Sequence, residues 1–195
     1  MRSHSGHLSL ALGVLLTCSV GQAIAQFDAM PDHSAQWIVH VYDGPNLWEE
    51  ESYSLSATPG DTLIDGESFT RLFRGSSPRG ALHDNGVGQV YFHDFGDHTT
   101  YLLYDFAVSP GDTVEVYNEP YFISPLYVIG VDSVQYAGTW RKRIGISESS
   151  MSAITPSYWI QGIGGVEGAS WSGGLLSTCG CTTVSLAYRL FCMSV

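Results

Sequence analysis

Basic residues are scarce in this chain, and lysine is nearly absent. The 195 residues include eight Lys and Arg against 19 Asp and Glu, and Lys142 is the only lysine. The formal net charge at pH 7 is −11. An acidic surface of this kind repels phosphate backbones and anionic lipid headgroups. We therefore expect no nucleic-acid partner.

The sequence also has no hydrophobic run long enough to span a bilayer, which requires ~18 apolar residues. Its longest uncharged apolar stretch, Leu8–Val20, follows Arg2 and precedes the small-x-small pattern of residues 23–25. These features are typical of a secretory signal peptide. The sequence predicts a signal peptide at 1–25, cleavage between Ala25 and Gln26, and one β-rich domain at 26–195, with no transmembrane segment. Without Arg2, seven basic residues face 19 acidic ones, a net charge of −12.

An alternative processing site lies inside the apolar stretch. Leu15-Leu16-Thr17-Cys18 resembles a lipoprotein box, in which Cys18 would carry the lipid anchor. Thr17 is bulky for the position before such a cysteine, and a signal-peptidase site follows. We expect a secreted or cell-surface protein, with an anchor at Cys18 as the alternative.

Cysteines are few and lie near the end of the sequence. Cys18 leaves with the signal peptide, so three remain. An oxidising compartment favours one disulfide and one leftover thiol. A bridge between Cys179 and Cys181 would close a strained ring. We expect a bridge from Cys181 to Cys192, with Cys179 as the alternative partner of Cys192.

No segment of the mature sequence shows a sustained helical period, and turn signals recur every 8 to 15 residues. This pattern predicts an all-β fold, an antiparallel meander that forms a β-sandwich or β-barrel of roughly ten strands. The expected strands are 37–42, 52–57, 68–73, 89–93, 99–107, 113–117, 126–135, 139–146, 158–163 and 183–192.

One tetrapeptide occurs twice, as Pro59-Gly60-Asp61-Thr62 and as Pro110-Gly111-Asp112-Thr113. Proline presets the first dihedral of a type II turn, and glycine accepts the positive φ that follows. We expect two equivalent turns, the first of which ends the strand at 52–57.

Several ordered motifs between residues 35 and 192 resemble a β-rich module of secreted bacterial proteins that often carry a type IX secretion sorting domain. Gln161 stands where that family commonly has Glu, which argues against a catalytic carboxylate there. This sequence ends at Val195 without a sorting domain, so the resemblance implies export without giving a final destination or an activity. The motifs are Asp61–Phe69, Tyr101–Phe106, Gly111–Thr113, Val131–Val134, Arg141–Ile144 and Trp159–Gly164.

The densest polar cluster is His93-Asp94-Phe95-Gly96-Asp97-His98. If it forms a hairpin, His93 and His98 lie on paired strands, with Asp94 and Asp97 at the turn. Imidazole and carboxylate groups together bind zinc, and carboxylates contribute to calcium sites. These four residues are the candidate ligands of a divalent metal, although Asp and Gly are also the residues that such a turn requires. Beyond this metal, the sequence indicates no cofactor.

Aromatic residues are plentiful, with five Trp and eleven Tyr. Aromatic rings within strands usually pack in the core, whereas exposed rings stack on sugars. Trp48 and Trp171 have polar, loop-like surroundings and are the candidate glycan-binding residues. Alternation also places Arg141 and Arg143 on one face of a strand, as a candidate site for a small anion or an acidic partner.

Several catalytic motifs are missing from the sequence. There is no phosphate loop, no His-Glu-x-x-His and no nucleophile elbow. The pattern therefore favours an exported binding or structural module, with a polysaccharide or a cell-surface protein as the partner, over an enzyme. The alternative is a small secreted hydrolase that uses the acidic and histidine cluster, with or without a metal.

Overall fold

A computed structural model describes residue 30 and residues 35–43, 48–117, 123–136, 138–147, 157–166 and 186–194. These residues form strands and turns, and no helix occurs among them, which confirms the predicted all-β class. The strands are β1 (Gln36–Asp43), β2 (Trp48–Ile64), β3 (Glu67–Arg74), β4 (Ser77–Asp84), β5 (Gln89–Asp94), β6 (Thr99–Asp105), β7 (Thr113–Tyr117), β8 (Ile123–Tyr136), β9 (Thr139–Ser147), β10 (Ser157–Ile160), β11 (Gly164–Val166) and β12 (Leu186–Ser194).

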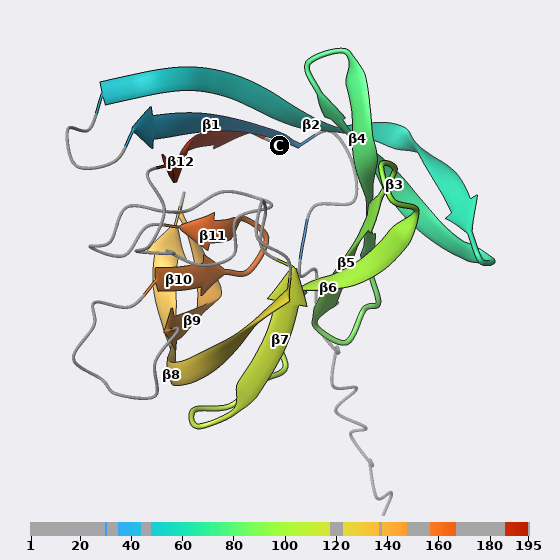
Figure 1. Cartoon of the computed structure of the whole chain (residues 1–195). Coiled ribbons are helices and arrows are strands. Elements are labelled where there is room, and N and C mark those ends of the chain that lie inside the picture. The colour runs from blue at the N-terminus through green and yellow to red at the C-terminus, as the bar shows by residue number, and fades with distance from the viewer. Residues whose placement is uncertain are drawn as a thin grey trace, which may run out of the picture.

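The strands make two curled antiparallel sheets (Figure 1). One has seven strands in the order β12-β1-β2-β3-β4-β5-β6, and the other has five in the order β11-β10-β9-β8-β7. The chain runs through each sheet as a meander, and only β12 returns from the end of the chain to pair with β1. This arrangement confirms the predicted antiparallel meander.

The core lies between the two sheets. Each strand alternates side chains between its two faces, and the inward positions carry large apolar residues. The largest fully buried side chains come from both sheets: Trp37, Leu55, Leu72, Phe92, Leu103, Tyr104, Phe106, Leu126, Ile144, Ile146 and Trp159. Trp159 packs edge-on against Tyr104 at 5.4 Å and against Phe106 at 6.4 Å between ring centroids, so aromatic contacts join the sheets.

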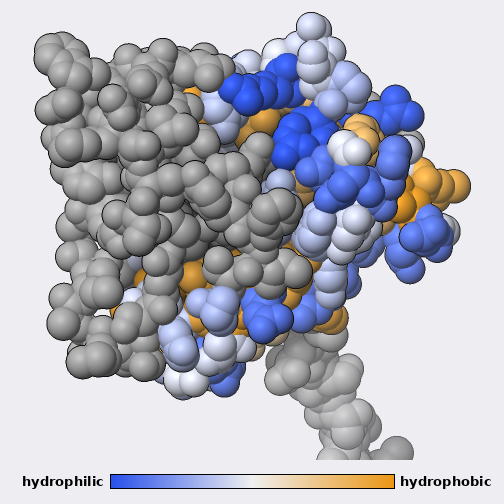
Figure 2. All heavy atoms as spheres, viewed as in Figure 1, coloured by the Kyte–Doolittle hydropathy of each residue, from blue (hydrophilic) through white to orange (hydrophobic). Residues whose placement is uncertain are grey.

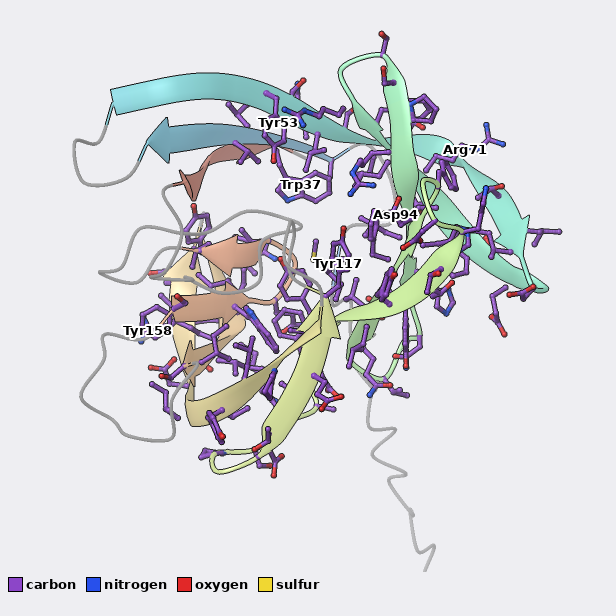
Figure 3. All side chains as sticks on the ribbon, viewed as in Figure 1. Trp37, Tyr53, Arg71, Asp94, Tyr117 and Tyr158 are labelled. Atoms are coloured by element: carbon purple, nitrogen blue, oxygen red, sulfur yellow. The ribbon has the colours of Figure 1, made fainter. Side chains whose placement is uncertain are left out.

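Two buried hydrogen bonds also tie the sheets together. Trp37 Nε1, in β1, donates to the carbonyl oxygen of Ile163 at 2.9 Å. The amide of Gly165, in β11, donates to the hydroxyl of Tyr104 at 2.9 Å. Figure 3 shows Trp37 pointing into the space between the sheets. These side-chain–backbone hydrogen bonds therefore hold the turn from β10 to β11 against the seven-stranded sheet.

The first Pro-Gly-Asp sequence does not end a strand, contrary to the sequence-based expectation. β2 continues from Trp48 to Ile64, and its register against β3 shifts between Thr58 and Asp61. A bulge leaves a residue unpaired, so the missing N–H of Pro59 costs no ladder hydrogen bond there. The second copy does form a turn, with Gly111 at φ +95°. The two copies are not equivalent.

Two strands were not expected from the sequence. β4 contains Pro78 and Gly80, residues that normally count against a strand. Pro78 pairs at a register shift of β3, and Gly80 makes room for the ring of Phe92 and the carbonyl of His93. β11 is only three residues long, which is too short for a periodic signal.

Candidate functional site

The structure does not place His93 and His98 on paired strands. β5 ends at Asp94, β6 begins at Thr99, and Thr100 is the residue opposite His93. His98 lies in the exposed turn with φ +58°, and its amide donates to the carbonyl oxygen of Asp94 at 2.9 Å. The two imidazoles therefore do not lie opposite each other.

The two carboxylates of this cluster bind neighbouring protein groups. Asp94 is 8% exposed and accepts from Arg79 Nη1 and from the Gly96 amide, both at 2.7 Å through Oδ1. Asp97 accepts from the Tyr101 hydroxyl at 2.6 Å and from the Thr99 amide at 2.9 Å. The Tyr101 hydrogen bond lowers the pKa of Asp97 below its ordinary value and raises the pKa of Tyr101.

No group of three or more His, Cys, Asp or Glu residues that could hold a metal ion occurs in the described part of the chain. His93, Asp94, Asp97 and His98 all fall within that part. Asp94 stabilises the inner side of the β4–β5 pair, and Asp97 stabilises the β5–β6 turn. The residues present thus perform structural roles, and the metal remains a prediction from the sequence.

The tryptophans divide sharply by exposure. Trp37 and Trp159 are fully buried, whereas Trp140 is 70% exposed. Trp140 lies near the tip of the β8–β9 hairpin, opposite Gln135. Tyr136, which is 42% exposed, belongs to the next pair, with Thr139. Sequence reasoning missed Trp140, although its position directly after the Ala137-Gly138 turn was a usable signal. The two glycan-binding candidates predicted from the sequence, Trp171 and the side chain of Trp48, lie outside the described residues.

Arg141 and Arg143 do lie on one face of β9, opposite Val134 and Asp132. Both bind protein groups: Arg143 forms a two-pronged ion pair with Asp132 at 2.8 and 2.6 Å, and Arg141 donates to the Gln161 carbonyl at 3.0 Å. Cys179, Cys181 and the side chain of Cys192 lie outside the described residues, so the disulfide remains a prediction.

A different group of side chains gathers on the outer face of the seven-stranded sheet, away from the core. We call it the outer-face patch and define it as Phe69 and Arg71 of β3, Ala81 and His83 of β4, Tyr91 and His93 of β5, and Thr100 of β6. Register establishes the shared face, since Arg71 pairs with Ala81, Ala81 with His93, and His93 with Thr100. The intervening residues, such as Leu82 and Phe92, face the core.

Ring contacts run across the outer-face patch from strand to strand. His83 lies against Phe69 at 5.0 Å and Tyr91 at 6.3 Å between ring centroids. His93 lies against Phe69 at 6.2 Å and against Phe95, in the following turn, at 5.9 Å. Phe69 is only 4% exposed but does not belong to the core cluster, because the imidazoles cover it. A second, smaller aromatic cluster therefore lies on the outside of the sheet.

Hydrogen bonds fix the orientation of both imidazoles. His83 Nδ1 lies 2.9 Å from the carbonyl oxygen of Ser68, and since a carbonyl only accepts, Nδ1 carries the proton. His93 Nδ1 lies 2.9 Å from Thr100 Oγ1. In each ring Nδ1 is engaged, and Nε2 is the nitrogen left for a ligand. Figure 2 shows that hydrophilic residues predominate on the described part of the visible surface, with isolated hydrophobic residues among them.

Comparison with known proteins supplies no further assignment: no family model, curated protein or solved structure matches this chain. Within the described residues, no helix has the length and apolar character that a membrane crossing needs.

Proposed function

We propose that this protein is an exported binding module and that it binds a glycan at the outer-face patch. The observation that carries the proposal is the continuous series of ring contacts Tyr91–His83–Phe69–His93 on the side of the sheet opposite the core. The solvent face of an antiparallel sheet is usually polar. Aromatic groups gathered there, with polar atoms among them, are typical of a ligand-binding surface.

The chemistry of the outer-face patch suits a sugar. Aromatic rings offer apolar surface to the C–H faces of a sugar ring. The free Nε2 atoms of His83 and His93 can hydrogen-bond sugar hydroxyls. The Tyr91 hydroxyl donates to Gln89 Oε1 at 3.0 Å, so its oxygen remains as an acceptor. Because His83 and His93 are held through Nδ1, little side-chain entropy is lost when a ligand binds.

Export rests on the sequence. Arg2, the apolar stretch to Val20 and the Ala23-Ile24-Ala25 pattern support a signal peptide, and the resemblance to a secreted β-rich module agrees with it. A glycan ligand fits a protein that acts outside the cell. The hydrolase alternative gains no support from the geometry, because Asp94 is paired with Arg79 and Asp97 with Tyr101.

The test is retention on insoluble polysaccharides and cell-envelope fractions. The full sequence is expressed in a bacterial host and the protein is purified from the exported fraction. Mass spectrometry then identifies its N-terminus. We expect Gln26; a lipidated Cys18 would show instead that the protein is membrane-anchored. We expect retention on at least one polysaccharide, lost in Tyr91→Ala and His83→Ala at an unchanged unfolding midpoint.

Trp140→Ala is the comparison variant, because it removes an exposed aromatic side chain from the other sheet. Retention lost only in Trp140→Ala would move the site to the tip of the β8–β9 hairpin. Retention on no polysaccharide would overturn the glycan assignment.

A further inference from the structure

Arg71 differs from the other basic residues of this protein. The structure describes six basic side chains, and five of them contact protein groups. Arg74 stacks over Tyr53, Arg79 pairs with Asp94, Arg141 and Lys142 donate to backbone carbonyls, and Arg143 pairs with Asp132. Arg71 is exposed and makes no ion pair or hydrogen bond with any residue whose side chain is described. Its guanidinium is available to a ligand.

Arg71 lies on the outer face of the sheet, among residues that carry no negative charge. It belongs to the outer-face patch, in the cross-strand row Thr58–Arg71–Ala81–His93–Thr100. The neighbouring row contains Thr62, Phe69, His83 and Tyr91. Neither row contains a carboxylate, although the chain has 19 Asp and Glu. Figure 3 shows Arg71 on the far side of the sheet from Trp37 and Tyr117, with Asp94 on their side.

We infer that the outer-face patch binds an acidic polysaccharide and that Arg71 binds its carboxylate. This inference rests on the proposed function and names the class of glycan. A guanidinium presents a planar set of donors that matches a carboxylate with two parallel hydrogen bonds. In the cross-strand row Ala81 lies between Arg71 and His93, so a uronic acid unit can place its carboxylate on Arg71 and its ring over Ala81, against the imidazole of His93.

Charge complementarity supports this class of ligand. The protein as a whole repels polyanions, because its net charge is −11. Within the outer-face patch no residue is a carboxylate and Arg71 has no ion pair with a described side chain, so a polyanion meets less repulsion there than the net charge implies; Glu67, four residues from Arg71, is the next carboxylate along this face of β3. A neutral glycan would need no unpaired arginine at this position.

The experiment compares two polymers with the same sugar backbone: polygalacturonate, whose carboxylates are ionised, and its methyl ester, whose carboxyl groups are uncharged. Binding to the full exported protein is measured by affinity electrophoresis or calorimetry. We expect polygalacturonate to bind about tenfold more tightly than the ester, the range of a charge-assisted hydrogen bond. Arg71→Gln should remove this preference, and Arg71→Lys should restore part of it.

Arg143→Gln is the control, because it removes the same charge from a partly exposed, ion-paired arginine on the other sheet. It should leave the preference for polygalacturonate unchanged. A preference lost equally in Arg143→Gln would show a general charge effect and overturn the assignment to Arg71. Polyglutamate tests the sugar ring, because it carries carboxylates without one; equal binding of polyglutamate would overturn the assignment to a polysaccharide.

The remaining outcomes separate the inference from the proposed function. Equal binding of polygalacturonate and its ester, unaffected by Arg71→Gln, would overturn the acidic class and leave glycan binding in place. The acidic class would also be overturned if the protein bound neither polygalacturonate nor alginate, another polyuronate, but was retained on a neutral polysaccharide in a way that requires Tyr91. Failure of every polysaccharide would overturn both.

Discussion

Trp37 and Ile163 lie 126 residues apart in the sequence, yet the indole Nε1 of Trp37 donates a buried hydrogen bond of 2.9 Å to the carbonyl oxygen of Ile163. This bond links β1, in the seven-stranded sheet, to the turn between β10 and β11 in the five-stranded sheet. It acts with the Gly165–Tyr104 bond, which spans the same gap. The β10–β11 turn is therefore part of the core and not a surface loop.

Trp37→Phe keeps an aromatic ring but removes the donor. The carbonyl of Ile163 is then buried without its partner, which should cost about 1–3 kcal/mol in the free energy of unfolding. Urea unfolding followed by fluorescence or circular dichroism measures the loss. Trp140→Phe is the control, since Trp140 is 70% exposed and should change stability by less than about 0.5 kcal/mol. Equal effects in the two variants would contradict the role given to Trp37.

Tyr104→Phe tests the second tie and has a pH signature. Removing the hydroxyl leaves the buried amide of Gly165 unpaired, at a cost of about 1–3 kcal/mol near neutral pH. Burial raises the pKa of Tyr104 well above its ordinary value, and the hydrogen bond from Gly165 offsets this only in part. Above about pH 10 the unfolded tyrosine loses its proton while the folded one keeps it.

The stability contributed by Tyr104 is thus fully present below about pH 10 and falls as the pH rises further. The Tyr104→Phe variant has no hydroxyl here and lacks this pH-dependent contribution to the free energy of unfolding. The difference in unfolding free energy between the wild type and Tyr104→Phe should therefore narrow at alkaline pH. Urea midpoints at neutral pH and above about pH 10 measure this, and a constant difference would count against burial of a neutral hydroxyl.

The sequence allowed most of the fold to be predicted, because alternation and turn chemistry are local. The hairpin formed by β8 and β9 was anticipated from the sequence Ala137-Gly138, and β7 was anticipated at its observed bounds, 113–117. The departures arise from tertiary context. Pro59 is tolerated within β2 by a bulge, and Gly80 lies in β4 because a ring from β5 occupies its space.

The candidate site was less predictable. His93 was selected from the sequence, but as a partner of His98 and of two carboxylates. Its actual neighbours, Phe69 and Thr100, come from other strands, and only the register brings them together. Similarly, nothing in the sequence distinguishes Arg71 from the other arginines. Ion pairing depends on tertiary contacts, so only the structure shows that Arg71, among the arginines whose side chains are described, lacks a partner that the others have.

Gly80→Ala should destabilise the protein strongly. A Cβ at this position would overlap the carbonyl oxygen of His93 and the ring of Phe92, and the backbone oxygen cannot move aside. We expect a loss of about 1–3 kcal/mol, measured by urea unfolding. Gly130→Ala is the matched control, because no atom lies within 4 Å of its Cβ position. A Gly80→Ala variant as stable as Gly130→Ala would contradict the tight β4–β5 contact.

Tyr101→Phe should raise the pKa of the Asp97 carboxyl toward its ordinary value. The hydroxyl of Tyr101 donates at 2.6 Å to the ionised carboxylate, and this hydrogen bond is the main cause of the lowered pKa. Carboxyl chemical shifts in an NMR titration report the change. Asp132 is the internal control, because its lowered pKa arises from Arg143, and it should titrate unchanged. An unmoved Asp97 would show that Tyr101 does not hold this turn.

Binding of a glycan by the outer face of β3–β5 can be mapped residue by residue with NMR. Galacturonate oligomers are titrated into the labelled protein, and shifts are followed at the imidazoles, at the Arg71 guanidinium and at the indole N–H groups. We expect saturable chemical-shift changes at His83, His93 and Arg71, with the Trp140 indole unchanged. Shifts confined to Trp140, or no shifts at the outer-face patch with any glycan that the protein retains, would contradict glycan binding at this face.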